Sequence, residues 1–505
     1  MSTLGAGSPA AVHSKDRAFF GHPWGLSTLF FTEMWERFSY YGMRAFLVLF
    51  LVDATRGGYA LDDRTANAIY GLYTAVVYMT SLPGGWIADR LIGPQAAVLW
   101  GGIIIACGHA LLGLSGSSHA IFYSGLVVII AGTGLLKPNV GSLISRLYPQ
   151  GGYGRDAGFT IYYMSVNLGA ILGPLIAGWL AQRYGWHYGF FAAAVGMMLG
   201  VVYFIRRRDW LGGAGSAPAP LVAGEKGLNA RGWLLGIGAV FAAVILIIAG
   251  DLVHVSPIAV QAGTTWIIVG LSAAYFGYLF MFARLTPLET RRALMMLILF
   301  FGCALFWSGF EQAGSSFNLF ASRYTNRNFG SFLIPAEWFQ SLNSTFIVIF
   351  APAFSALWVR LGARNLDPSA PVKFALGLLG MALGFVVMAA AAGYVALGQQ
   401  VSPAWLVTVY LIHTFGELCL SPVGMSAFTK LAPSRLAGQA LGLWFMATAL
   451  GNLIAGRIAG EFDANNLGAM SGQLMRIFRF GAISAIALLI VGGVVSKWIK
   501  RAEPS

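Results

Sequence analysis

Charged residues are scarce in this chain of 505 residues. Asp, Glu, Lys and Arg together make up 10% of the sequence, whereas hydrophobic residues make up 57% and the mean hydropathy is +0.70. Because a soluble globular protein carries about 25% charged residues, this composition excludes an ordinary soluble domain. A helix needs about 20 apolar residues to cross a bilayer, and runs of that length account for most of the chain. The sequence therefore predicts an all-α integral membrane protein.

Cysteines are also few, and the motifs of an enzyme are missing. Cys107, Cys303 and Cys419 all lie in apolar runs and show neither a disulfide framework nor metal-ligand spacing. The sequence contains no His-Glu-x-x-His, and Gly-Leu-Ser-Gly at 113–116 falls in a short loop with no base assigned to it. We therefore expect no catalytic residues, no metal and no cofactor.

The first 23 residues lack the apolar core and cleavage site of a signal peptide, so the first span is expected to be retained. The formal net charge is nevertheless +13. Lys and Arg gather on alternate loops and at both ends of the chain, as the positive-inside rule describes for cytoplasmic segments. We expect a multi-pass protein of the cell (inner) membrane with both termini in the cytoplasm. The lipid bilayer explains the charge pattern, and no nucleic-acid partner is required.

Apolar runs predict fourteen membrane-spanning helices, an even number that agrees with both termini on one side. The predicted spans are 24–52, 66–88, 95–114, 119–144, 158–182, 186–205, 233–250, 262–284, 293–313, 338–359, 371–396, 402–430, 437–459 and 477–499. A linker rich in Gly, Ala and Pro separates the first six spans from the rest. The predicted domains are an N-terminal tail (1–23), an N-terminal six-helix bundle (24–205), the cytoplasmic linker (206–232), two additional transmembrane helices (233–284), a C-terminal six-helix bundle (293–499) and a C-terminal tail (500–505).

An internal repeat relates the two six-helix groups. PNVGSLISRLYP (138–149) and PVGMSAFTKLAP (422–433) both begin and end with proline and share a serine at the fifth position. Each ends the fourth span of its group and is followed by Arg-x-Ala-Gly. A parallel six-plus-six repeat is the architecture of the major facilitator transporters, and chance similarity of two helix ends is the alternative. GGWIADRLIG (84–93) also resembles the loop motif of that superfamily, in which an Asp-Arg pair caps a helix end.

Seven ionisable residues lie well inside the predicted spans, where charge is costly unless it is paired or faces water. They are Glu33, Glu36, Arg37, Arg44, Lys137, Glu311 and Glu417. Four are carboxylates and three are cations, so the interior is neutral if one carboxylate holds a proton. This balance suits a proton-coupled carrier.

Helical spacing places these charges on polar faces. Glu33, Arg37 and Arg44 recur at intervals of four and seven residues, with Tyr40 and Tyr41 between them, and so form one stripe. Spacing by four residues also links Trp307 to Glu311, Tyr163 to Asn167, and His413 to Glu417 and Ser421. Polar faces on several helices predict one shared aqueous cavity.

Packing is the alternative role for each of these residues. Buried ion pairs such as Glu33–Arg37 and Lys137–Glu417 can be static and contribute little to stability. Asn167 and Asn343 would then form only helix–helix hydrogen bonds, and His413 is interpreted as a packing residue. The same alternative applies to the aromatic residues Tyr40, Tyr41, Tyr78, Trp307 and Trp444.

These motifs together resemble the proton-dependent oligopeptide transporter family, the bacterial relatives of the intestinal peptide carriers. The family's Glu-x-x-Glu-Arg-Phe stands here as Glu33, Glu36, Arg37 and Phe38. Further matches run in order to about residue 455, so the resemblance covers nearly the whole chain. They are GTGLLKPNVGSL with Lys137, FTIYYMSVNLGA with Asn167, FWSGFEQ with Trp307 and Glu311, WFQSLNS with Asn343, GELCLSPVGMS with Glu417 and Ser421, and finally Trp444.

The resemblance implies a major facilitator fold and a proton-coupled symporter that imports di- and tripeptides by alternating access. It implies proton coupling by Glu33, Glu36, Arg37 and Glu311. It implies that an Arg44–Glu311 pair closes the outer side and a Lys137–Glu417 pair the inner side. The implied peptide-binding residues are Arg37 and Lys137 for the carboxylate, Glu417, Asn343 and Asn167 for the ammonium group, and Tyr40, Tyr41, Arg44, Tyr78, Trp307, Ser421 and Trp444 around them.

Two other functions remain open from the sequence. A carrier of the same fold could move another small solute, such as an amino acid, nitrate or a drug. A receptor or channel without proton coupling is the second. The expected partners are di- and tripeptides, protons and the bilayer, with a monomer as the default state. A packing or lipid-facing role is the guess for helices 233–284.

Overall fold

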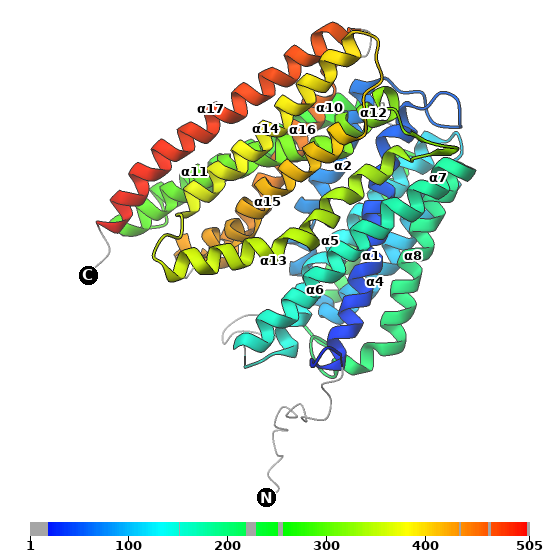
Figure 1. Ribbon diagram of the computed structural model, residues 1–505. Helices are drawn as coiled ribbons and strands as arrows, with labels where there is room; N and C mark the ends of the chain where they lie inside the picture. Colours follow the sequence, from blue (N-terminus) through cyan, green and yellow to red (C-terminus); the bar gives the residue numbers. More distant parts are fainter. Residues whose placement is uncertain are drawn as a thin grey trace, which may run out of the picture.

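The computed structural model describes residues 19–150, 152–218, 229–250, 256–433, 436–462 and 466–501. Residues 1–18 of the predicted tail, 219–228 of the predicted linker and 502–505 at the end of the chain lie outside these ranges, as does Arg435 of the second repeat. The described chain is almost entirely helical (Figure 1).

The first half of the chain forms one bundle. Its helices are α1 (Trp24–Val52), α2 (Asp63–Met79), α3 (Ser81–Ile87), α4 (Pro94–Leu114), α5 (His119–Leu147), α6 (Gly152–Gly173), α7 (Trp179–Tyr184) and α8 (Trp186–Arg207). Thr80, which has helical backbone angles, joins α2 directly to α3. The π-helical turn Pro174–Gly178, which is wider than an α-helical turn, joins α6 to α7. A second wide turn, Ala88–Ile92, follows α3, and a short 3-10 turn, Arg208–Leu211, follows α8. The bundle therefore contains six long helical segments.

The second half repeats this plan after two extra helices. The elements are α9 (Ala230–Ala249), α10 (Pro257–Met281), α11 (Pro287–Phe310), α12 (Ser316–Tyr324), the hairpin β1 (Asn328–Phe329) and β2 (Phe332–Leu333), α13 (Ser341–Ala363), α14 (Ala370–Ala396), α15 (Ala404–Leu431), α16 (Ala437–Ala459) and α17 (Leu467–Lys500). Two 3-10 turns, Glu311–Gly314 and Ala336–Gln340, follow α11 and precede α13.

The last span, predicted as 477–499, begins earlier in the structure than the sequence indicates. The helix begins at Leu467 rather than at residue 477, because Asn466 caps it by accepting a hydrogen bond from the Ala469 N–H at 3.2 Å. Arg476 and Arg479 interrupt the apolar run in the sequence, but both side chains lie exposed on the helix surface. These two charges lower the mean hydropathy of the first turns, so the apolar pattern does not predict that those turns belong to the helix.

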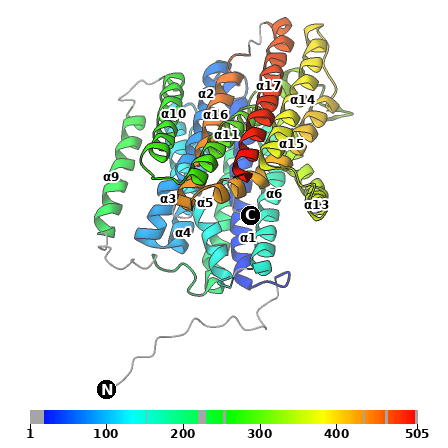
Figure 2. The same ribbon diagram turned by 90° about the vertical axis from the view of Figure 1, so that its left-hand side faces the viewer.

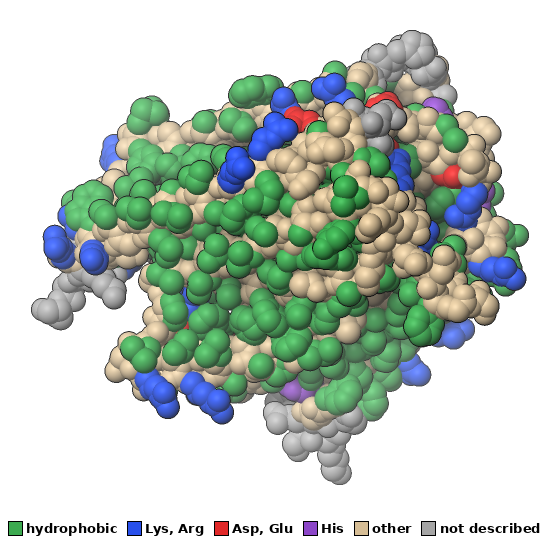
Figure 3. Space-filling model, turned by 45° about the horizontal axis from the view of Figure 1, so that its top comes forward, with side chains coloured by type: hydrophobic (Ala, Val, Ile, Leu, Met, Phe, Trp, Pro, Cys, Tyr) green, Lys and Arg blue, Asp and Glu red, His purple; other side chains and the backbone are tan. Residues whose placement is uncertain are grey.

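The predicted fold class is confirmed. In the described part of the chain, twelve helices are long and apolar enough to cross a membrane. The charged residues of α1 keep it out of that group, and α1 and the α2–α3 pair complete the fourteen predicted spans. In Figure 3, hydrophobic side chains cover the middle of the visible flank and Lys and Arg gather at its edges. This distribution fits a bilayer-spanning body with polar ends.

The two bundles lie side by side, with α2 packed against α16 and α6 against α13 (Figure 1). α9 and α10 lie on one flank (Figure 2), where α9 is mostly exposed and contacts α5 and the turn Ala88–Ile92 of the first bundle. We call the end where α1 begins and α17 ends the terminal face. We call the end that carries the loop 53–62 and the β-hairpin the opposite face. In Figure 1, α13 and α15 lean away from α5 and α6 toward the terminal face.

The two repeat segments occupy corresponding positions. Pro138 lies inside α5 and Pro422 inside α15, and each of these is the fourth long helix of its bundle. The motif at 84–93 lies at the end of α3, where Asp89 forms an ion pair of 3.7 Å with Arg146 of α5. The motif thus fastens the α3 end to a neighbouring helix.

Glycine allows α3 and α5 to cross closely. A Cβ atom on Gly84 would overlap the backbone carbonyl of Gly134, and one on Gly134 would lie 2.7 Å from the Thr80 carbonyl oxygen. Small residues permit such approaches between membrane helices. The neighbouring Gly85 has room, because its added Cβ would meet only Pro138 at 3.8 Å.

We predict that Gly84→Ala destabilises the protein by about 1–3 kcal/mol, the usual cost of overpacking. Gly85→Ala is the matched control, because it adds the same atom to the same helix without a close contact. Thermal unfolding of the purified variants in detergent measures the difference. Equal unfolding midpoints for the two variants would contradict the close crossing of α3 and α5.

Candidate functional site

Two glutamates and one arginine form a buried cluster in the middle of α1. Arg37 Nε lies 2.8 Å from Glu33 Oε1 and 2.6 Å from Glu36 Oε2, and all three side chains are at most 5% exposed. Glu33 and Arg37 meet because they lie one helical turn apart. Gly169 of α6 packs against Arg37 so closely that a Cβ there would lie 2.7 Å from the Arg37 Cβ. The cluster is thus enclosed by its own helix and by α6.

This cluster leaves hydrogen-bonding capacity unused. Arg37 Nη2 and Glu33 Oε2 are buried and have no hydrogen-bond partner in the described structure. A buried polar atom without a partner costs about 1–3 kcal/mol, so such atoms mark places where a ligand, water or a proton is expected. The arginine therefore has a nitrogen available to a ligand although its Nε is already held.

A second cluster links the two bundles through Arg44. Arg44 Nη2 lies 2.6 Å from Glu311 Oε2, and Arg44 Nε donates a hydrogen bond of 2.7 Å to the Tyr70 hydroxyl. Arg44 and Tyr70 belong to the first bundle, whereas Glu311 follows α11 in the second. Gly314 makes room for this contact, because a Cβ there would overlap the Tyr70 hydroxyl. The predicted Arg44–Glu311 pair is therefore present in this structure.

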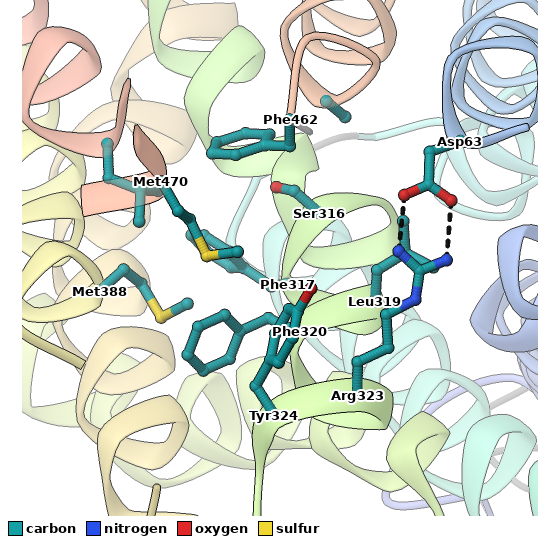
Figure 4. A pocket seen from close by; sticks show the side chains of 12 residues that line it. Asp63, Ser316, Phe317, Leu319, Phe320, Arg323, Tyr324, Met388, Phe462 and Met470 are labelled. Atoms are coloured by element: carbon teal, nitrogen blue, oxygen red, sulfur yellow. Dashed lines mark hydrogen bonds and ion pairs between the residues drawn. The ribbon is translucent and has the colours of Figure 1, made fainter. Parts of the chain in front are cut away.

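A third ion pair closes the opposite face. Arg323 of α12 makes two contacts, 2.6 and 2.7 Å long, to the carboxylate oxygens of Asp63 at the start of α2. Figure 4 shows the two groups facing each other at the rim of a small pocket lined by Phe317, Phe320 and other apolar side chains. Nearby, the Asn318 side chain donates a hydrogen bond of 2.6 Å to the Ala45 carbonyl. Polar contacts between the bundles thus gather toward the opposite face.

The second bundle supplies an amide–carboxylate group. Asn343 Nδ2 on α13 donates hydrogen bonds of 2.8 Å to Glu417 Oε2 and 3.1 Å to Thr414 Oγ1, both on α15. Asn343 and Glu417 are half-buried. One oxygen of the Glu417 carboxylate is therefore held by an amide rather than by a cation.

Lys137 does not meet Glu417 in this structure. Its ammonium lies 3.8 Å from the centre of the Tyr78 ring, and in the described residues no ion pair joins it to Glu417. Tyr78 in turn stacks on Phe445 of α16 at 6.5 Å. Two ion pairs are predicted as gates. The structure brings Arg44 and Glu311 together toward the opposite face but leaves Lys137 and Glu417 apart. The bundles are thus joined at the opposite face, while α13 and α15 diverge from α5 and α6 toward the terminal face (Figure 1).

The remaining predicted residues lie around these groups. Tyr40 and Trp444 are buried, and Tyr41, Trp307 and Ser421 are half-buried. The buried Asn167 amide donates to the Tyr163 carbonyl of its own helix at 2.9 Å. His413 is buried with its Nε2 3.0 Å from the Met381 carbonyl, among Phe310, Phe317 and Phe385. Three polar atoms of this set have no partner in the described structure, namely Tyr40 Oη, Trp307 Nε1 and Ser421 Oγ.

Sequence reasoning missed four residues of these clusters. Tyr70 lies on α2 two turns before Tyr78, and that shared helix face was the signal that could have found it. Thr414 lies within one turn of Glu417. The Asp63–Arg323 pair joins residues far apart in the chain and lies at the ends of helices, where charges are common. No local spacing could have found it.

Comparison with known proteins agrees with this arrangement. A family model described as the POT family matches residues 95–472. The peptide transporter YePEPT of Yersinia enterocolitica is 40% identical over 490 residues, which cover 95% of this chain and 94% of that protein. The di-/tripeptide transporter of Lactococcus lactis subsp. cremoris is 34% identical over 497 residues, covering 95% and 97%. A crystal structure of a peptide transporter POT in complex with sulfate gives a TM-score of 0.87 at 40% identity, covering 95% of this chain and 97% of that one.

We predict that Tyr70→Phe destabilises the protein by about 1–3 kcal/mol, because it leaves the buried Arg44 Nε without its acceptor. Tyr73→Phe is the matched control on the same helix. The Tyr73 hydroxyl is buried without a partner in the described structure, so its removal should be neutral or slightly stabilising. Thermal unfolding in detergent distinguishes the two. An equal loss in both variants would show that the Arg44–Tyr70 hydrogen bond does not contribute.

Proposed function

This chain belongs to the POT family of the major facilitator superfamily, and we propose that it is a proton-coupled symporter that imports di- and tripeptides by alternating access. It is a multi-pass membrane protein of a family of transporters, and we assign it no enzymatic activity. The observation that carries the proposal is the α1 cluster. There Arg37 is held by two glutamates yet keeps a buried nitrogen that no described residue contacts by a hydrogen bond.

Charge balance supports proton coupling. If Glu33 and Glu36 were both ionised, their cluster with Arg37 would carry one net negative charge in a buried place, which is costly. A proton on either glutamate removes that charge. Protonation also releases part of the hold on Arg37, whose guanidinium can then form charge-assisted hydrogen bonds with another carboxylate. In this scheme the glutamates and the peptide carboxylate compete for Arg37. A proton on a glutamate weakens that competitor, so the proton and the peptide favour each other's binding.

The two ends of a peptide find complementary groups on different bundles. Arg37 and Lys137, on the first bundle, are the cations available for the peptide carboxylate. Glu417 and Asn343, on the second bundle, are the groups for the ammonium end, since Glu417 already accepts from an amide and has no cation partner in the described residues. A zwitterion that contacts both sets draws the bundles together at the terminal face. Binding would then favour the state that is closed there.

The aromatic residues suit cargo with varied side chains. Tyr40, Tyr41 and Tyr78 belong to the first bundle, near Arg37, Arg44 and Lys137, and Trp307 and Trp444 belong to the second. Aromatic rings offer apolar and cation–π contacts without requiring one particular side chain. If charged residues bind the two peptide ends and aromatic residues accept varied side chains between them, one site can carry many different peptides.

The ion pairs provide the gates. Arg44–Glu311 closes the opposite face here, and protonation of Glu311 would release Arg44 and let that face open. Lys137 and Glu417 would pair when the terminal face closes. Lys137 and Glu417 would exchange Tyr78 and Asn343 for each other, and Arg44 would keep its hydrogen bond to the Tyr70 hydroxyl. No charge would then be left buried without a partner, which would cost several kcal/mol. The terminal face and both termini would be cytoplasmic, with the chain lying in the inner membrane as a monomer.

The alternative cargo is not favoured. A carrier of an amino acid, nitrate or a drug would share the fold and the α1 cluster. However, the curated relatives from Yersinia enterocolitica and Lactococcus lactis are named for peptides. Competition of peptide uptake by free alanine or nitrate separates these cargoes.

We predict that proteoliposomes containing the wild-type protein accumulate dialanine only with an inward proton gradient. Glu33→Gln should abolish accumulation, because a neutral amide cannot exchange the proton, but it should keep counterflow exchange. An accumulation loss of about tenfold or more corresponds to about 1.4 kcal/mol of lost coupling.

Glu461→Gln is the matched control, since Glu461 is a strongly exposed carboxylate whose side chain is 70% exposed. It should transport as the wild type does. If the wild type ignores dialanine under every gradient, the cargo is wrong. If Glu33→Gln still accumulates dialanine normally, the proton path does not include Glu33.

A further inference from the structure

A polar cavity of about 420 Å³ lies at the opposite face, between the two bundles. The first bundle lines it with Asp53, Arg56 and Trp186, and the second bundle with Arg323, Arg327 and Glu337. Small-molecule sites commonly enclose about 300–1,000 Å³. None of the seven ionisable residues predicted from the spans lines this cavity, so it is separate from the α1 cluster.

Two arginines of the cavity form no ion pair with a carboxylate in the described residues. Arg323 is already bound to Asp63, and Asp53 accepts hydrogen bonds from Trp186 Nε1 at 2.8 Å and from the Arg56 backbone N–H at 2.8 Å. In the described residues, neither Arg56 nor Arg327 has an ion-pair partner. Arg56, Arg323 and Arg327 thus lie near the carboxylates of Asp53, Asp63 and Glu337, but in the described residues only Arg323 is ion-paired. The guanidinium groups of Arg56 and Arg327 keep donors that no carboxylate of the described cavity contacts.

Both guanidinium groups are positioned by the backbone. Arg56 Nη2 donates hydrogen bonds to the carbonyls of Ala181 at 2.6 Å and Gln182 at 2.9 Å, and its guanidinium lies 4.6 Å from the Trp186 ring centre. Arg327 Nη1 donates to the Ile334 carbonyl at 2.7 Å. A guanidinium has five N–H donors in a fixed fork, so each group keeps donors for a ligand. Pre-ordered arginines lose less conformational freedom when they bind an anion.

The two arginines are close enough to affect each other. Burial lowers the pKa of the Arg327 guanidinium, Glu337 raises it, and the positive charge of Arg56 lowers it again. By contrast, the pKa of Asp53 is lowered, because the hydrogen bonds from Trp186, Thr55 and Arg56 outweigh the opposing effect of burial. Asp53 therefore stays ionised, with its oxygens engaged by hydrogen bonds from Trp186, Thr55 and the Arg56 backbone.

We propose that this cavity is a binding site for a small oxyanion, a carboxylate or a phosphate, held between Arg56 and Arg327. One arginine comes from each bundle, so a bound anion joins the bundles where the Arg323–Asp63 pair already does. A ligand that bridges both bundles binds more tightly when the opposite face is closed, and it stabilises that state. A zwitterion would also place its ammonium group near Glu337, whereas an inorganic anion would not. The binding does not depend on which cargo the central residues carry.

The test measures the reaction of individual arginines with phenylglyoxal in the purified full-length protein at constant ionic strength. Peptide mass spectrometry reports the modification rate of Arg56, Arg327 and Arg183 separately. Arg183 is the internal control, because it is exposed at the same face and follows Gln182 directly but does not line the cavity. The probes are inorganic phosphate, dialanine and alaninamide, which lacks a carboxylate.

We expect a saturating probe to slow modification of Arg56 and Arg327 by about tenfold, as strong charge-assisted contacts require, and to leave Arg183 unchanged. Protection by phosphate alone identifies an inorganic-anion site, and protection by dialanine alone identifies a zwitterion site. Protection by both identifies the shared oxyanion chemistry. Protection by neither, by alaninamide, or equally at Arg183 would overturn the proposal.

Three variants test whether protection from phenylglyoxal arises from an anion bound in this cavity. Arg327→Gln should remove the protection of Arg56, and Arg56→Gln should remove that of Arg327, so either variant serves if the other fails to fold. Lys137→Gln should keep the protection of both. If protection disappears in Lys137→Gln, the anion acts from the central cavity and the proposed site is wrong. Failure of dialanine uptake alone would refute the peptide cargo and leave this site untouched.

Discussion

The cost of placing charge in hydrocarbon constrains this molecule more than any other interaction. Every buried charge needs a partner, water or a proton, so the ionisable residues of the spans meet in groups. Arg37 lies between Glu33 and Glu36, and Arg44 lies between Tyr70 and Glu311. The surface that faces lipid is correspondingly apolar, with Lys and Arg at its edges (Figure 3). The helices of both bundles thus contribute to these groups, and Arg44 and Glu311 join one bundle to the other.

The same constraint explains why ion pairs join the bundles toward the opposite face, while Lys137 and Glu417 lie apart. At the opposite face, Arg44–Glu311 and Arg323–Asp63 join the bundles, and Gly314 packs closely against the Tyr70 hydroxyl. Toward the terminal face, Lys137 lies on Tyr78 and Glu417 on Asn343. Each of these charges has a substitute partner while its proposed partner is away. Exchange of partners costs far less than loss of a partner, and an assembly with two such arrangements is bistable.

The need to pair charges also applies to the cavity lined by Arg56 and Arg327 at the rim of the protein. Arg56 and Arg327 sit where water reaches them, so they tolerate the lack of a carboxylate partner better than Arg37 or Arg44 would. Their positions on opposite bundles are nevertheless set by backbone carbonyls rather than by chance contact. The opposite face thus combines a fixed ion pair, Arg323–Asp63, with two cations that an external anion can neutralise. The concentration of such an anion would then shift the equilibrium between the closed and open states of the opposite face, on which the buried ion pairs also act.

The sequence by itself determined the class of molecule, its helices and the residue types of the site. Apolar length and helical spacing are local properties, so the bounds of α1 and α16 and the Glu33–Arg37 pair follow from the sequence alone. Tertiary structure decided which distant groups meet. It placed Tyr70 on Arg44, Thr414 on Asn343 and Arg323 on Asp63, and it kept Lys137 apart from Glu417. Such contacts depend on how two bundles lean against each other, and that geometry is set by the sum of many packing contacts rather than by any spacing along one helix.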